Sequence, residues 1–195
     1  MTAAEALRAG WPAVLAFDTV YGLAAEPHRE ESARRLYELK GRAATQPTAL
    51  VAPDLPALLA VFPELDERVA ELLPAPLTLV VPNRAHRFPW LTGANPDALG
   101  VRVPVLPDVT SRLLAEVGAV AATSANLPGG PDPRRLEDVP ERIRSGAAAV
   151  VDGGELPGTP STVVDLTEGE PRILRAGAVP AEEILRRLGV AVRSS

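Results

Sequence analysis

Short apolar runs bounded by turn-forming residues recur along the chain. Four or five consecutive apolar residues between Gly, Pro or Asp are typical of strands that are covered on both faces. The pattern predicts strands at residues 14–17, 48–52, 77–81, 99–104, 119–122 and 147–151. Two further strands, at 161–166 and 172–175, flank a short Glu-Gly-Glu turn and are close enough to form a hairpin.

The segments between these runs have helical spacing. Residues 29–39 place Ala33, Leu36 and Tyr37 on one face, and Gly41 suits the C-terminal cap of that helix. The same reasoning predicts helices at 3–9, 54–59, 64–73, 107–117, 140–145 and 180–188. Strands that alternate with helices in this way predict a mixed α/β fold.

Length and composition narrow the class of protein. A chain of 195 residues with 46% hydrophobic content is expected to form one domain over residues 1–195. No apolar run approaches the roughly 18 residues of a membrane span, and no signal segment opens the chain, so we expect a cytoplasmic protein with no membrane partner. The absence of cysteine excludes disulfides and thiolate catalysis, and two isolated histidines give no metal motif. A net charge of −5 argues against non-specific coating of nucleic acid.

The basic residues are almost all arginine. Nineteen of the twenty are Arg, and the single lysine is Lys40, in the sequence Lys40-Gly41-Arg42. A compact ammonium suits a phosphate site, which is one interpretation of the pair. The other interpretation is that both side chains only complement the negative end of the preceding helix dipole.

Polar groups also gather where predicted strands end. Residues 18–23 follow the first strand and residues 123–131 follow a later one, and ligands of open α/β sheets bind at such places. Arg102 stands between two valines, so it faces either solvent or an anion. Thr78 is expected to be a packed β-branched residue, and residues 83–96 form either a lid or a plain loop. No Walker or GxGxxG motif is present.

Seven ordered motifs resemble those of the YrdC family over nearly the whole chain. They occupy residues 18–23, 40–42, 76–80, 101–104, 124–126, 161–165 and 173–177. The resemblance implies a twisted mixed β-sheet with surrounding helices and a central basic cavity. It also implies L-threonylcarbamoyladenylate synthase activity, in which L-threonine, bicarbonate and ATP give threonylcarbamoyl-AMP and pyrophosphate for the t6A modification of tRNA.

The resemblance further implies roles for individual residues. The residues expected to bind ATP are Lys40, Arg42, Gln46, Ser124, Asn126 and Arg175, with Gln46 standing where the family usually has Asn. The residues expected to bind threonine are Thr19, Arg102 and Ser161. Mg²⁺ would accompany ATP, and we expect no protein nucleophile, no protein metal site and no tightly bound cofactor. Enzymes of t6A transfer and RNA or tRNA are the expected partners.

The chain departs from the family pattern at several positions. Val51 replaces a usual histidine, Asp132 a usual serine and Pro160 a usual glutamate, and residues 16–17 and 73–76 also differ. Two hypotheses therefore remain. The first is the synthase. The second is a diverged YciO-like protein that binds nucleotide or RNA with little or no synthesis, and threonine-dependent release of pyrophosphate distinguishes the two.

Overall fold

The computed structural model describes residues 1–189, and the last six residues of the expected domain, 190–195, lie outside the described residues. The strands of this part are β1 (Ala13–Ala16), β2 (Tyr21–Ala25), β3 (Ala49–Val51), β4 (Leu77–Pro82), β5 (Ala98–Arg102), β6 (Val120–Ser124), β7 (Ala149–Val150), β8 (Thr162–Asp165) and β9 (Arg172–Arg175). They form one sheet in the order β7-β1-β2-β6-β3-β5-β4-β8-β9. The pairs β1–β7, β3–β5 and β4–β8 are parallel and the others antiparallel, which confirms the predicted mixed α/β class.

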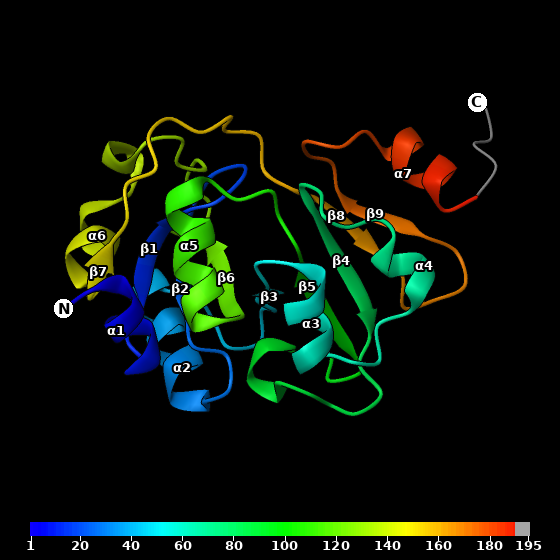
Figure 1. Cartoon of the computed structure of the whole chain (residues 1–195), viewed down its shortest axis with the longest axis horizontal. Helices are drawn as coiled ribbons and strands as arrows, with labels where there is room; N and C mark the ends of the chain where they lie inside the picture. The colour runs from blue at the N-terminus through cyan, green and yellow to red at the C-terminus, as the bar shows by residue number, and fades with distance from the viewer. Residues whose placement is uncertain (190–195) are drawn as a thin grey trace.

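Helices and short 3₁₀ turns surround the sheet (Figure 1). They are α1 (Ala3–Arg8), α2 (Glu30–Lys40), α3 (Leu55–Val61), α4 (Glu67–Ala70), η1 (Pro89–Leu91), α5 (Asp108–Val117), η2 (Leu136–Asp138), α6 (Glu141–Gly146) and α7 (Ala181–Arg187). Thr2 caps α1 through a capping box with Glu5, as its sequence predicts. Gly41 ends α2 at φ 69°, a left-handed conformation that favours glycine. None of the helices between residues 1 and 189 has the length and hydropathy that a bilayer crossing requires.

The sheet is covered on both faces, which explains the continuous apolar runs. In β1, Val14 and Ala16 belong to the larger core cluster, which also contains Leu36 of α2. The neighbouring residue Leu15 belongs to a second cluster with Leu114 of α5. Because successive side chains of a strand point to opposite faces, a strand between two helical layers must be apolar at every position.

Three sequence-based predictions need correction. Residues 18–23 were predicted to be a polar segment after a strand end, but residues 21–25 form β2. The chain turns back at 17–20, and Gly22 leaves room for the ring of Phe17, which a Cβ would meet at 2.6 Å. The helix expected at 64–73 is only α4, since the side chain of Asp66 caps it by accepting from Arg68 N–H. The strand expected at 147–151 is reduced to two paired residues, β7, at the edge of the sheet.

Residues 83–96 form a packed loop and not an open lid. The Trp90 indole N–H donates to the Pro27 carbonyl at 2.8 Å, and the Trp90 carbonyl accepts from the Tyr37 hydroxyl at 3.0 Å. Phe88 is buried in the main core. Gly93 lies so close to the loop after α2 that a Cβ would meet the Thr45 carbonyl at 2.6 Å. The segment therefore fixes the loop that follows α2.

Residues 151–161 cross the molecule from β7 near one end of the sheet to β8 near the other (Figure 1). Two contacts fasten this crossing segment near the β1–β2 turn. The buried Tyr21 hydroxyl lies 2.7 Å from Asp152 Oδ1, and Gly158 N–H donates to the Thr19 carbonyl at 2.8 Å. Burial is the main cause that raises the pKa of Tyr21 to about 12, and the hydrogen bond to Asp152 adds to it. This hydroxyl therefore stays protonated. The segment ends at Ser161, a buried residue directly before β8.

Candidate functional site

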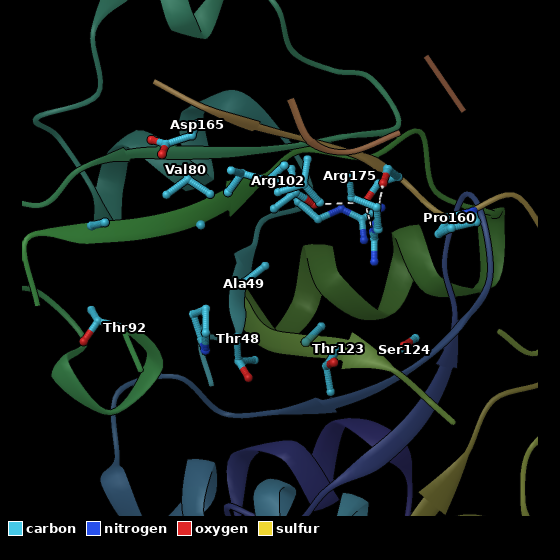
Figure 2. A pocket seen from close by; sticks show the side chains of 18 of the residues that line it. Thr48, Ala49, Val80, Thr92, Arg102, Thr123, Ser124, Pro160, Asp165 and Arg175 are labelled. Carbon is cyan, nitrogen blue, oxygen red and sulfur yellow. Dashed lines mark hydrogen bonds between the residues drawn. The ribbon is translucent and has the colours of Figure 1, made fainter. Parts of the chain in front are cut away.

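A cavity of about 410 Å³ opens at the ends of several strands and is lined by residues from Thr19 to Arg175. Figure 2 shows Arg102 and Arg175 along one wall, with Thr123 and Ser124 along the opposite wall. Of the nine predicted site residues, six line this cavity, namely Thr19, Arg42, Arg102, Ser124, Ser161 and Arg175. Lys40, Gln46 and Asn126 do not line it. The basic cavity implied by the resemblance is therefore present, with arginine as its cation.

Arg102 leaves the end of β5 and enters the cavity wall beside a buried carboxylate. Its Nη2 donates to Asp18 Oδ1 at 2.8 Å, and the two side chains are only 13% and 6% exposed. Burial lowers the pKa of the Arg102 guanidinium, which Asp18 opposes, and burial likewise raises the pKa of Asp18, which Arg102 opposes. Arg102 Nε and Asp18 Oδ2 are buried without partners. The sequence left open whether Arg102 faces solvent or an anion, and its burial beside Asp18 excludes the solvent-facing orientation.

Arg175 and Ser161 form a second polar group on the same wall. The guanidinium donates through Nη2 to the Ser161 carbonyl at 2.8 Å and to its hydroxyl at 3.1 Å. The Ser161 hydroxyl also lies 2.9 Å from the Thr78 hydroxyl of β4. Thr78 was expected to be a packed residue, and the structure adds that it also lines the cavity. The sequence signal that could have found it is the single hydroxyl residue within the apolar run 77–81, since alternate positions of a strand face the same side and in β4 Thr78 and Val80 are both half-buried.

Arg42 stands on the opposite wall and is held by three protein acceptors. Its Nη1 donates to the Thr123 hydroxyl at 2.9 Å, its Nη2 to the Pro47 carbonyl at 2.7 Å, and its Nε to Gln46 Oε1 at 3.1 Å. Gln46 thus contacts Arg42 and not the cavity. Burial lowers the pKa of Arg42, but a guanidinium stays charged in proteins, so the wall is cationic.

Lys40 and Arg42 both reach the end of β6, but Lys40, unlike Arg42, does not line the cavity. Its Nζ donates to the Ser124 carbonyl at 2.6 Å, to the Asn126 carbonyl at 2.9 Å and to Asn126 Oδ1 at 2.8 Å. The residue is 5% exposed. Burial is the main cause that lowers the pKa of Lys40 to about 8, and the positive charge of Arg42 adds to it. The negative charge of Asp132 acts in the opposite direction.

The loop after β6 is closed on itself by side-chain hydrogen bonds. Asn126 Nδ2 donates to the Gly130 carbonyl at 2.7 Å, and the Ser124 hydroxyl donates to Asn126 Oδ1 at 2.7 Å. Ser124 lines the cavity with its proton already used, so its oxygen faces the cavity as an acceptor. We call residues 124–130 the β6 loop.

The remainder of the cavity is largely uncharged. Thr48 and Thr92 line the end away from Arg175 (Figure 2), and Thr48 Oγ1 is buried without a partner. Asp165 is the lone acidic residue among the described lining residues, and Arg172 Nη2 binds it at 2.7 Å. The cavity thus joins a cationic part to a neutral part, as a ligand with anionic and apolar portions requires.

Two of the positions that depart from the family pattern lie away from the cavity. Val51 is fully buried in the second core cluster, and Asp132 is half-buried and does not line the cavity. Pro160, by contrast, contributes to the wall next to Ser161. Among residues 1–189, no three His, Asp or Glu side chains gather into a group that could hold a metal ion.

Comparison with known proteins places this chain in a family. The Sua5/YciO/YrdC family model, described as telomere recombination, matches residues 5–177. The chain belongs to this family. A threonylcarbamoyl-AMP synthase of Pyrococcus abyssi is 35% identical over 193 residues, which are 96% of this chain and 56% of that protein. A putative threonylcarbamoyl-AMP synthase of Mycobacterium tuberculosis is 32% identical over 195 residues, which are 97% of this chain and 89% of the relative.

Solved structures of family members have the same fold. P. abyssi Sua5 in complex with L-threonine superposes with a TM-score of 0.87 at 34% identity, over 96% of this chain and 56% of that one. E. coli YciO superposes with a TM-score of 0.76 at 24% identity, over 95% of this chain and 90% of that one. The chain therefore spans just over half the length of the P. abyssi protein and most of YciO.

Proposed function

We propose that the protein is an L-threonylcarbamoyladenylate synthase, a nucleotidyltransferase that makes threonylcarbamoyl-AMP and pyrophosphate from L-threonine, bicarbonate and ATP for t6A modification of tRNA. The observation that carries the proposal is the convergence of Arg42, Arg102 and Arg175 on one cavity together with the hydroxyls of Ser161 and Thr78. Such a set suits one small carboxylate and one polyphosphate in the same space. The threonine complex of the P. abyssi relative supports the choice of amino acid.

Threonine would bind at the wall formed by Arg102, Ser161 and Thr19. Within residues 1–189, Arg102 Nη1 has no hydrogen-bond partner, so it is available to a carboxylate while Asp18 holds Nη2. The paired hydroxyls of Ser161 and Thr78 can exchange donor and acceptor roles and so suit a substrate hydroxyl or amine.

ATP would bind with its phosphates between Arg42 and Arg175 and its remaining part toward the neutral end of the cavity. The positive wall favours the triphosphate, and burial strengthens that attraction because water screens it less. Mg²⁺ would arrive with the phosphates as part of the substrate, since this ion commonly keeps phosphate and water ligands rather than a protein cage.

The reaction needs positioning more than covalent help from the protein. The threonine amine and bicarbonate first give the carbamate and water. A carbamate oxygen then bonds to the α-phosphorus of ATP while the bond from that phosphorus to the bridging oxygen breaks, and pyrophosphate leaves with the electron pair. Arg42 and Arg175 would stabilise the charge on the phosphate oxygens, and Arg102 would hold the threonine carboxylate in line.

Pyrophosphate release tests the proposal. Purified protein with Mg-ATP and bicarbonate should release pyrophosphate when L-threonine is added and should form threonylcarbamoyl-AMP in equal amount. Nucleotide binding without threonine-dependent release would refute the synthase and favour the YciO-like alternative. The same assay with t6A transfer enzymes and tRNA examines the proposed partners.

Two variants separate the substrates. Ser161→Ala removes a hydroxyl from the proposed threonine wall and should raise the KM for threonine about tenfold with little change for ATP. Arg42→Met should raise the KM for ATP more than that for threonine. Arg112→Met, a change of an exposed arginine on α5, is the matched control and should leave both constants unchanged.

A further inference from the structure

The single lysine of the chain has every ammonium proton engaged by the protein. An ammonium offers three donors, and Nζ of Lys40 has three acceptors between 2.6 and 2.9 Å. All three belong to Ser124 and Asn126, at the start of the β6 loop. No proton of Lys40 is left for a substrate, and the residue does not line the cavity.

We propose that Lys40 is a positioning residue that fixes the shape of the β6 loop, and that the cavity relies on arginine for its direct phosphate contacts. This inference rests on the proposed function for its kinetic consequences, but its structural part stands without it. In this proposal the Lys40 ammonium stabilises the β6 loop in the cavity wall and does not contact the substrate.

Hydrogen bonds connect Lys40 to the cavity in a short series. Lys40 donates to Asn126 Oδ1, the same oxygen accepts from the Ser124 hydroxyl at 2.7 Å, and Ser124 lines the cavity. Asn126 then spans the loop by donating to the Gly130 carbonyl. Because the backbone carbonyls of Ser124 and Asn126 both accept from Nζ, losing the ammonium would leave two partly buried acceptors without this donor.

The geometry also explains why lysine persists in a chain that otherwise uses arginine. A tetrahedral ammonium can place three donors on acceptors that converge on one atom, whereas a guanidinium carries its donors in a wider planar fork. At 5% exposure Lys40 is enclosed by protein, and a larger group there would have to displace its neighbours. In the described part of the chain, Lys40 forms no ion pair with a carboxylate, so carbonyl oxygens are its direct partners, and Asp132 stabilises its charge only through a longer-range interaction.

Hydrogen exchange in the ligand-free protein tests the structural part directly. The Ala125 amide, which donates to the Tyr21 carbonyl at 2.8 Å, and the Gly130 amide, which donates to the Leu127 carbonyl at 2.9 Å, report on the β6 loop. Both should exchange at least about tenfold faster in Lys40→Met than in the wild type, because the loop loses three hydrogen bonds. Amides of β4 serve as the internal reference and should be unchanged. If Lys40→Met does not fold, Lys40→Gln is measured in its place.

Kinetics test the consequence for turnover. Lys40→Arg keeps the charge but not the geometry, so kcat should fall about a hundredfold, as expected for a misplaced wall, with a smaller change in the KM for ATP. Arg175→Met is the matched cavity variant, and it should raise the KM for ATP without changing exchange in the β6 loop. Arg112→Met again controls for the loss of an exposed charge.

Two results would overturn the inference. Either wild-type exchange at Ala125 and Gly130 in the lysine variant, or near-wild-type kcat in Lys40→Arg, would mean that Lys40 acts through its charge on the substrate. If the wild type itself releases no pyrophosphate, the proposed function fails, and the exchange measurement alone then decides the role of Lys40.

Discussion

Replacing Arg102 by methionine should cost far more folding stability than removing an exposed arginine that makes the same contact. The Arg102–Asp18 pair and the Arg8–Glu116 pair both have a nitrogen–oxygen distance of 2.8 Å. The first pair is 13% and 6% exposed, and the second is 54% and 56% exposed. Burial is therefore the main difference between the two pairs, beside a second bond from Arg8 Nη2 to the Glu116 carbonyl at 3.1 Å.

The magnitude follows from what each substitution leaves behind. Arg102→Met leaves the carboxylate of Asp18 buried with no cation, which typically costs about 3–5 kcal/mol. Arg8→Met leaves Glu116 in water, which costs about 1 kcal/mol or less. For a chain of this size the first loss lowers the melting temperature by roughly 6 to 20 °C. The double variant Arg102→Met with Asp18→Asn removes both charges and should recover most of the loss.

Urea unfolding followed by circular dichroism measures these differences, and pH supplies a second check. The pKa of Asp18 already lies above its ordinary value of 3.8. Without Arg102 it rises further, so the folded protein keeps a proton that the unfolded chain has released. The loss of stability in Arg102→Met is then largest at pH 8 and smaller at pH 5. Equal losses for the Arg102 and Arg8 variants, within about 0.5 kcal/mol, would refute the reasoning.

Two further predictions concern the cavity wall. In Gly177→Ala the new Cβ would meet the backbone nitrogen of Thr162 at 2.6 Å, so the wall that carries Ser161 must shift; we expect about 2 kcal/mol of destabilisation and a raised KM for threonine. Gly169→Ala, with nothing within 4 Å, is the control for both measurements. The second prediction uses the pKa of Lys40, which lies at about 8 in the folded protein against 10.5 ordinarily. Because the unfolded chain binds the extra proton between these values, the free energy of unfolding should rise from pH 8 to pH 10 in the wild type, and Lys40→Met should lack that rise.

Local signals predicted the elements that position the site. The helix that ends at Lys40 follows from its spacing and from Gly41, both of which lie within a few residues of the feature they determine. Arg102 was found because it stands among valines, where a charge needs a partner, whereas the roles of Arg42 and Arg175 came from the resemblance to the family. The partner itself, Asp18, was not predictable, because it comes from the turn after β1 and meets β5 only in the folded sheet.

The contacts of Lys40 could not be predicted from the sequence either, because its partners are also distant in the chain. Neither of the two interpretations of Lys40, as a phosphate ligand or as a complement to the helix dipole, included hydrogen bonds to Ser124 and Asn126, which lie far away in the chain. The strand β2 was missed because its small residues and its glycine read as a loop until the packing of Phe17 is known.

The walls of the cavity come from both early and late parts of the chain, from Thr19 at one extreme to Arg175 at the other. During synthesis, therefore, no complete pocket exists until β9 has joined the sheet, and such distant pairings slow folding. A bound nucleotide would contact residues from the first and the last third of the polypeptide and would therefore stabilise their association. At a concentration one hundred times its dissociation constant it would add about 2.7 kcal/mol to the stability of the entire chain, so substrate supply would also govern how long the protein survives proteolysis.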